Sequence, residues 1–238
     1  MPHDVDARRP GGSVAAWDGP TRLFKWGLVL LVAGAWATQH YGLLEWHLRI
    51  GYAILVLLVF RLLWGMVGSS TARFAAWVTW PWTALRYGIG LVRGRAPAYL
   101  SHNPLGGWMI LVLLALVGTQ AVTGLFTVDD NGIYGGPFAN LDFGDPTPVQ
   151  SLFGRWHHLA FNIILAFVAI HVAANLIYQF VKKDPVVQAM ITGRKPVEPF
   201  VDQPAMRPAS MLLGRALACL TIAIAIVLGG IRLGGGSF

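Results

Sequence analysis

The sequence predicts an all-α membrane protein. Hydrophobic residues make up 55% of its 238 residues and charged residues only 12%, a composition too apolar for a soluble domain of this length. Five stretches are apolar over about the 20 residues that a helix needs to cross a hydrocarbon core. Backbone polar groups inside lipid must be satisfied within the protein, so each stretch is expected to be helical.

The five expected spans are residues 24–41, 47–67, 108–126, 157–181 and 211–231. The polar, Gly-rich residues before the first span do not look like a cleavable signal peptide, so that span is expected to remain in the mature chain. The chain is therefore divided into a cytoplasmic N-terminal segment (1–22), a four-span bundle (23–195), and a linker with a fifth, C-terminal transmembrane helix (196–238).

Basic residues gather in the loops on one side of the predicted membrane. They are Arg8, Arg9, Arg22, Lys25, Arg73, Arg86, Arg93, Arg95, Lys182, Lys183, Arg194, Lys195 and Arg207. The opposite loops carry Arg49, Arg155 and Arg232 together with Glu45, Asp129, Asp130, Asp142 and Asp145. This asymmetry places the N-terminus in the cytoplasm and the C-terminus outside. The net charge of +7 thus reflects topology, and no nucleic-acid partner is expected.

The long connection between the second and third spans contains an amphipathic stretch near residues 75–92. Its aromatic and basic residues are Trp77, Trp80, Trp82, Arg86 and Arg93. Tryptophan beside arginine is typical of a helix that lies on a membrane surface. An interfacial helix is therefore expected here, although Pro81 weakens its regularity.

Two histidines in the fourth span, His157 and His171, are fourteen residues apart. At about 3.6 residues per turn, both rings leave one face of the helix, roughly 21 Å apart along its axis. An imidazole in hydrocarbon is costly and needs a partner, so a functional site is favoured, and two stacked haems would fit. Hydrogen bonds to neighbouring helices are the alternative. His158 lies about 140° away around the helix, so His157 is the favoured ligand.

The predicted topology supplies a partner at each depth. His47 opens the second span level with His157 near the outer surface, and Lys25 opens the first span level with His171 near the cytoplasm. The chain thus offers an outer pair and an inner pair of candidate ligands. The single cysteine, Cys219, cannot form the Cys-x-x-Cys-His attachment of a c-type haem, so any haem is b-type.

Two arginines lie near the inner level. Arg61 follows His47 by fourteen residues and Arg22 precedes Lys25 by about one turn. Either guanidinium could pair a haem propionate. For Arg61, snorkelling to the membrane surface is an equal alternative.

Seven motifs between about residues 17 and 195 carry a family resemblance. They are Arg22-Leu23-Phe24-Lys25-Trp26, His47 followed by Gly51-Tyr52, Phe60-Arg61-Leu62-Leu63-Trp64-Gly65, His102-Asn103-Pro104-Leu105-Gly106-Gly107, Thr123-Gly124-Leu125-Phe126, Asn162 with His171-Val172, and Ala189-Met190-Ile191-Thr192-Gly193-Arg194-Lys195. Together they resemble the small bacterial di-haem membrane cytochromes b of the cytochrome b-561 type, which include the cytochrome b subunits of nickel-iron hydrogenases.

The resemblance implies a four-helix haem-binding transmembrane bundle with two b haems, each held by two histidines. The matching positions are His47 and His157 for the outer haem and His171 for one side of the inner haem. Lys25 stands where the family pattern has the fourth histidine. A lysine amine can ligate iron only when neutral, which burial favours, so a Lys25/His171 haem is expected first. Two alternatives remain. The inner haem could have another ligand or an open position in place of Lys25, or the inner haem could be absent, with Lys25 reaching the membrane surface.

Two axial protein ligands leave no iron position for oxygen or substrate, which favours electron transfer. The resemblance implies a subunit in the bacterial inner membrane that links a periplasmic c-type cytochrome or redox enzyme subunit to membrane quinone. A self-sufficient quinone oxidoreductase acting on a small molecule such as superoxide, and a structural anchor of a redox complex, are the alternatives.

The predicted outer connection, residues 127–156, is acidic and rich in Gly and Pro, so turns or a short lid are expected. An acidic face near an outer haem would suit a basic soluble redox partner, because complementary charge steers encounter. A solvated loop with no electrostatic role is the alternative.

Overall fold

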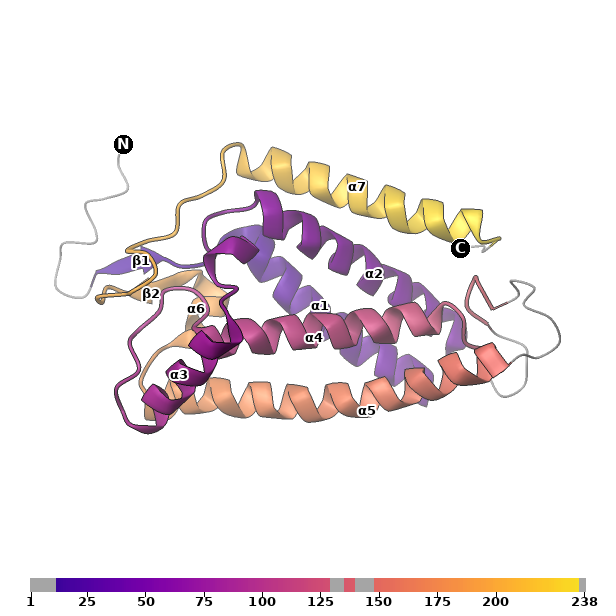
Figure 1. The fold of residues 1–238 in the computed structure, drawn as a ribbon. Helices are drawn as coiled ribbons and strands as arrows, with labels where there is room; N and C mark the ends of the chain where they lie inside the picture. Colours follow the sequence, from indigo (N-terminus) through magenta and orange to yellow (C-terminus); the bar gives the residue numbers. More distant parts are fainter. Residues whose placement is uncertain (1–11, 129–134, 140–147, 236–238) are drawn as a thin grey trace. The chain divides into compact units, whose positions relative to one another are not determined.

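The computed structural model describes residues 12–128, 135–139 and 148–235. Its elements, in chain order, are β1 (Ser13–Ala15), α1 (Gly19–His40), α2 (Leu44–Val67), the 3-10 turn η2 (Phe74–Ala76), α3 (Pro81–Val92), α4 (Pro104–Gly124), α5 (Pro148–Leu176), the π-helical turn η3 (Ile177–Val181), α6 (Val186–Thr192), β2 (Arg194–Pro196) and α7 (Leu212–Leu233) (Figure 1). The acidic residues predicted for the outer loop, Asp129, Asp130, Asp142 and Asp145, lie outside the described residues, as do Arg8 and Arg9.

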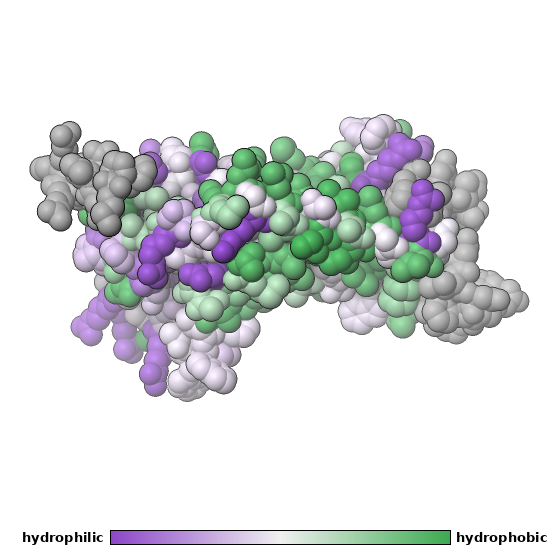
Figure 2. All heavy atoms as spheres, turned by 90° about the horizontal axis from the view of Figure 1, so that it is seen from above, coloured by the Kyte–Doolittle hydropathy of each residue, from purple (hydrophilic) through white to green (hydrophobic). Residues whose placement is uncertain are grey.

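Within the described part of the chain, four helices are long and apolar enough to cross a membrane. They are α2, α4, the continuous helix Leu152–Val181 and α7, and they match four of the five predicted spans. Side chains along the long helices are mostly hydrophobic on the face seen in Figure 2. The remaining predicted span, 24–41, corresponds to α1, a helix of 22 residues that ends at His40. Polar residues at both ends of α1, such as Lys25 and Gln39, lower its mean hydropathy, and its membrane crossing stays a prediction.

The chain divides into two compact units, and each long helix contributes to both. The first unit comprises residues 1–23, 63–112 and 169–216, and the second unit comprises residues 24–62, 113–168 and 217–238. The second unit is built on a buried cluster of aliphatic side chains from α2, α4 and α5, namely Ile54, Leu58, Val117 and Ile164. The first unit has its own buried cluster, Val14, Ala16, Trp17, Leu100 and Ala189.

The beginning of α1 is defined by a buried cap in the first unit. The Asp18 side chain, only 3% exposed, accepts a hydrogen bond from the Thr21 backbone N–H at 2.8 Å. This is the usual way in which an aspartate satisfies a free N–H in the first turn of a helix. The second carboxylate oxygen of Asp18 accepts from the Trp64 indole N–H at 3.2 Å, so the cap also joins α1 to the end of α2.

A small antiparallel sheet was not predicted for this all-helical chain. β1 pairs with β2, with Ser13 opposite Pro196. The turn before β2 is made by Gly193, whose φ of 79° suits the left-handed residue that often ends a helix. A Cβ on Gly193 would lie 2.7 Å from the Trp17 carbonyl oxygen, so only glycine fits this position.

The predicted interfacial stretch contains one helix, α3, which begins at Pro81 rather than near residue 75. Trp80 is extended, with ψ of 143°, because the residue before a proline avoids the helical region. Ala84 and Tyr87 are the buried residues of α3. The Tyr87 hydroxyl lies 2.9 Å from the Tyr178 hydroxyl on η3, which holds α3 within the first unit.

Candidate functional site

The structure brings the predicted outer ligands together in the second unit. His47 stands near the start of α2, and His157 lies on α5. Their ring centroids are 6.2 Å apart, and the ring planes meet at 80°. Both side chains are half-buried, whereas the neighbouring His158 is exposed. His158, the alternative ligand to His157, is therefore not part of this half-buried pair.

A backbone carbonyl orients each of these rings. His47 Nδ1 lies 2.8 Å from the carbonyl oxygen of Ala35 on α1, and His157 Nδ1 lies 2.9 Å from the carbonyl oxygen of Gln120 on α4. A carbonyl only accepts, so Nδ1 carries a proton in both histidines, and in a neutral ring the lone pair would lie on Nε2. Metal-ligating histidines typically have this second contact, which fixes the tautomer and the ring direction.

Gln120 contacts both nitrogens of the His157 ring. Its side-chain amide Nε2 lies 3.0 Å from His157 Nε2 and can only donate there, which agrees with a lone pair on the histidine nitrogen. Within the described residues, the buried Oε1 of Gln120 has no hydrogen-bond partner. Sequence reasoning missed this residue. The available signal was an amide side chain inside an otherwise apolar span.

Two further residues of α4 shape the pocket around His157. The Thr123 hydroxyl oxygen lies 3.3 Å from His157 Nδ1 and donates its own proton to the Thr119 carbonyl at 2.8 Å. Gly124 faces the same ring, and a Cβ there would lie 3.0 Å from His157 Cε1. The ring thus sits directly against the backbone of α4.

His47 and His157 could hold the iron of a b haem between their imidazole rings, and the haem would then supply one-electron exchange. The Gln120 side-chain amide contacts His157 Nε2 at 3.0 Å and would have to turn away for that nitrogen to bind iron.

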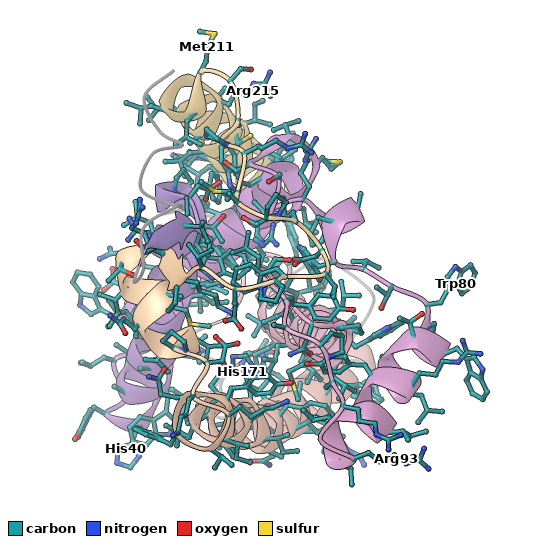
Figure 3. The ribbon with its side chains drawn as sticks, turned by 90° about the vertical axis from the view of Figure 1, so that its left-hand side faces the viewer. His40, Trp80, Arg93, His171, Met211 and Arg215 are labelled. Atoms are coloured by element: carbon teal, nitrogen blue, oxygen red, sulfur yellow. The ribbon has the colours of Figure 1, made fainter. Side chains whose placement is uncertain are left out.

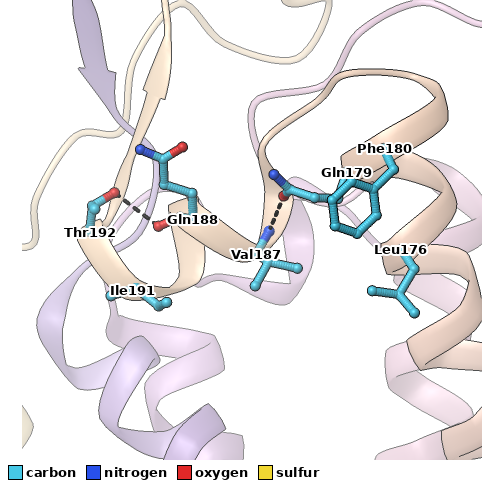
Figure 4. A pocket seen from close by; sticks show the side chains of 7 residues that line it. All are labelled: Leu176, Gln179, Phe180, Val187, Gln188, Ile191 and Thr192. Atoms are coloured by element: carbon cyan, nitrogen blue, oxygen red, sulfur yellow. Dashed lines mark hydrogen bonds between the residues drawn. The ribbon is translucent and has the colours of Figure 1, made fainter.

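His171, the predicted inner ligand, belongs to the first unit, where it lies on α5 (Figure 3). Its Nε2 accepts from the Asn175 amide at 3.0 Å, and the same amide nitrogen donates to the His171 carbonyl at 2.8 Å. Lys25 is half-buried and belongs to the second unit. Pairing of Lys25 with His171 therefore stays a prediction.

The two predicted propionate partners differ in burial. Arg22 is half-buried, donates from Nη1 to the Ile191 carbonyl, and has a buried Nε with no hydrogen-bond partner among the described residues. Arg61 is only 3% exposed, and its guanidinium carbon lies 5.9 Å from the centre of the Phe24 ring. A carboxylate would satisfy the Nε of Arg22.

Long apolar helices together with a half-buried, carbonyl-oriented histidine pair are typical of a helical membrane cytochrome. Residues 16–193 match the prokaryotic cytochrome b561 family, and the chain belongs to that family. The family prediction is confirmed. The chain is thus a multi-pass membrane cytochrome b that binds b-type haem and transfers electrons.

Three similar proteins are probable Ni/Fe-hydrogenase B-type cytochrome subunits. The protein from Azotobacter chroococcum mcd 1 is 25% identical over 215 residues, covering 76% of this chain and 88% of the relative. The protein from Azotobacter vinelandii is 24% identical over 216 residues, with the same coverage of 76% and 88%. The protein from Rhizobium leguminosarum bv. viciae is 26% identical over 161 residues, covering 63% of this chain and 66% of the relative.

Proposed function

We propose that the chain is the membrane electron-transfer subunit of an oxidoreductase complex in the bacterial inner membrane. It passes electrons between a periplasmic redox partner, either a c-type cytochrome or an enzyme subunit, and membrane quinone. The observation that carries the proposal is the outer histidine pair, with ring centroids 6.2 Å apart and each Nδ1 bonded to a backbone carbonyl. Relatives described as hydrogenase cytochrome subunits support an enzyme partner.

His47 and His157 are the proposed ligands of the outer haem. Held by two imidazoles, the haem would supply one-electron exchange and would offer no iron position to a substrate. Residues of this chain orient the two rings. The carbonyls of Ala35 and Gln120 accept from the Nδ1 atoms, and Gly124 lets α4 approach the His157 ring.

Lys25 and His171 are the proposed ligands of a second, inner haem. Ligation by Lys25 needs the neutral amine, so binding of iron would release a proton. Arg22 and Arg61 are the proposed partners of haem propionates, and the buried Nε of Arg22 supports the first of these. Charge-assisted bonds from guanidinium groups are the usual means of holding such carboxylates.

The proposed topology has five spans, with the N-terminus in the cytoplasm and the C-terminus in the periplasm. α1 would be the first span, since its 22 residues reach about 33 Å, roughly the thickness of a hydrocarbon core. The basic connection that contains α3 would then face the cytoplasm.

Substitution of the outer ligands tests the proposal. Purified His47→Ala and His157→Ala proteins are each expected to lose one b haem per polypeptide, measured by haem quantification and by the reduced-minus-oxidised spectrum. His158→Ala is the matched control, because its exposed ring adjoins His157 in sequence and should leave haem content unchanged. Wild-type haem content in both ligand variants would refute the assignment.

A further inference from the structure

A groove runs along α3 and the start of α4 in the first unit. Its volume is about 520 Å³, within the range of roughly 300–1,000 Å³ typical of small-molecule sites. Leu85, Ile89, Val92 and Leu105 give it apolar walls, and Gly88 leaves space between them. Arg93, at the C-terminal end of α3, is the charged residue of its lining.

The apolar face of α3 remains uncovered by the rest of the first unit. Val92 is 90% exposed, Leu85 50% and Ile89 45%. Trp80, just before α3, is 82% exposed, and Figure 3 shows both Trp80 and Arg93 projecting outward from the two ends of this helix. Apolar side chains that are exposed beside tryptophan and arginine indicate contact with lipid at headgroup depth. This groove is therefore expected to meet lipid rather than water.

The charged side chains of the connection that forms most of the groove have one sign. Asp184, which acts on Tyr87 of α3, is paired with Lys195 at 2.9 Å. The connection between α2 and α4 carries Arg73, Arg86, Arg93 and Arg95, while residues 46–128 contain no Asp or Glu. Across the described ranges, none of these four arginines forms an ion pair with a carboxylate. A guanidinium group binds phosphate well, and basic pockets at the cytoplasmic ends of membrane helices bind anionic lipid headgroups. Charge complementarity thus favours an anionic occupant.

We propose that this groove binds one anionic phospholipid, with an acyl chain against Leu85, Ile89 and Leu105 and the phosphate against Arg93. A quinone fits the observations less well, because its carbonyl oxygens can accept a hydrogen bond from Arg93 but its headgroup has no negative charge to pair with the guanidinium. A zwitterionic phospholipid carries its own cation beside the phosphate, which weakens the attraction. The groove shares no residue with the outer histidine pair, so the proposal goes beyond electron transfer. It rests on the proposed topology but not on the haem ligands.

Lipid binding to the full, haem-loaded chain tests the proposal. Delipidated protein in detergent is titrated with phosphatidylglycerol or phosphatidylcholine, and bound lipid is counted by native mass spectrometry. Wild type is expected to retain one phosphatidylglycerol in preference to phosphatidylcholine. Arg93→Gln should weaken phosphatidylglycerol binding about five-fold, the effect expected of one arginine near a lipid headgroup. Arg86→Gln is the matched control, since Arg86 is exposed on the same helix and does not line the groove.

A second variant tests the acyl-chain part of the groove. A Cβ at Gly88 would lie 3.4 Å from Leu105 Cδ1, so Gly88→Leu should fill the space between the walls and reduce retention of both lipids. An unchanged b-type spectrum confirms that each variant is folded. If Arg93→Gln and Arg86→Gln weakened phosphatidylglycerol binding equally, the general positive charge of α3 would explain the binding without a specific site at Arg93. This result would overturn the proposal. Equal affinity of wild type for the two lipids would also overturn the proposal. Displacement of phosphatidylglycerol by ubiquinone that is equally efficient in wild type and in Arg93→Gln would overturn it as well.

Discussion

The orientation of the outer histidines depends on residues of other helices. The Ala35 carbonyl that holds His47 belongs to α1, and the Gln120 carbonyl that holds His157 belongs to α4. Helical spacing and predicted topology were enough to propose His47 and His157 from the sequence. The carbonyl contacts were beyond such reasoning, because any residue can supply a backbone oxygen and only the packed structure shows which one approaches the ring.

Gly124 gives a direct test of this close approach. Gly124→Ala would place a Cβ 3.0 Å from His157 Cε1 and push the ring away from the Gln120 carbonyl. Such overpacking costs about 1–3 kcal/mol, which corresponds to roughly five-fold to hundred-fold weaker retention of the outer haem. Haem content after dilution and the redox titration of the outer haem measure the effect.

Gly118 supplies the matched control on the same helix. A Cβ there would meet no atom within 4 Å. Gly118→Ala should therefore be neutral or stabilise α4 slightly, because alanine is the better helix former. If the two alanine variants retained haem equally, the contact between Gly124 and His157 would have no role in the site.

At the level of elements, hydropathy and length predicted the long helices well. The span expected at 47–67 is α2, Leu44–Val67, and the span expected at 211–231 is α7, Leu212–Leu233. The β1–β2 pair was not predicted, because each strand has three residues and carries no alternating pattern of its own. It forms only once Gly193 reverses the chain after α6. The β1–β2 pair is therefore stabilised by contacts with the rest of the first unit rather than by the sequences of its own strands.

The contact between α3 and η3 predicts a pH dependence. Burial, reinforced by the hydrogen bond to Tyr178, raises the pKa of Tyr87 well above its usual value. The folded state then keeps this proton while an unfolded tyrosine loses it near pH 10. The contribution of Tyr87 to stability should be fully present below about pH 9 and should be lost as pH rises above about 10. Thermal unfolding in detergent at pH 8 and pH 10.5 measures this loss.

Tyr87→Phe should show a smaller alkaline loss of stability than wild type. At pH 8 it should also be less stable by about 0.5–1.5 kcal/mol, because the hydroxyl contact with Tyr178 is lost. Tyr41→Phe is the control, since Tyr41 is exposed at the end of α1. An alkaline fall of the same size in wild type and Tyr87→Phe would assign the pH dependence to other groups.

For the whole molecule, the number of haems decides whether electrons can cross the membrane. A single outer haem would exchange electrons with a partner on one side of the membrane. Two haems, at the depths of His157 and His171, would form a path across the bilayer, because these residues are roughly 21 Å apart on one helix. The outer ligands belong to the second compact unit and His171 to the first. Loss of the outer haem is therefore not expected to unfold the surroundings of His171.

Lys25 decides between these possibilities. With a Lys25/His171 haem, wild type should contain two b haems per polypeptide, one of them with the near-infrared and resonance Raman signature of lysine ligation. Lys25→His should keep two haems and convert that signature to the bis-histidine form, because imidazole binds iron without the deprotonation that an amine requires. Lys25→Ala should lose the inner haem alone.

Lys182→His is the control, because it adds a histidine at an exposed position after η3. It should change neither the number of haems nor their ligands. An increase from one haem to two in Lys25→His would instead show that the natural chain carries only the outer haem, and that its electrons enter and leave on one side of the membrane.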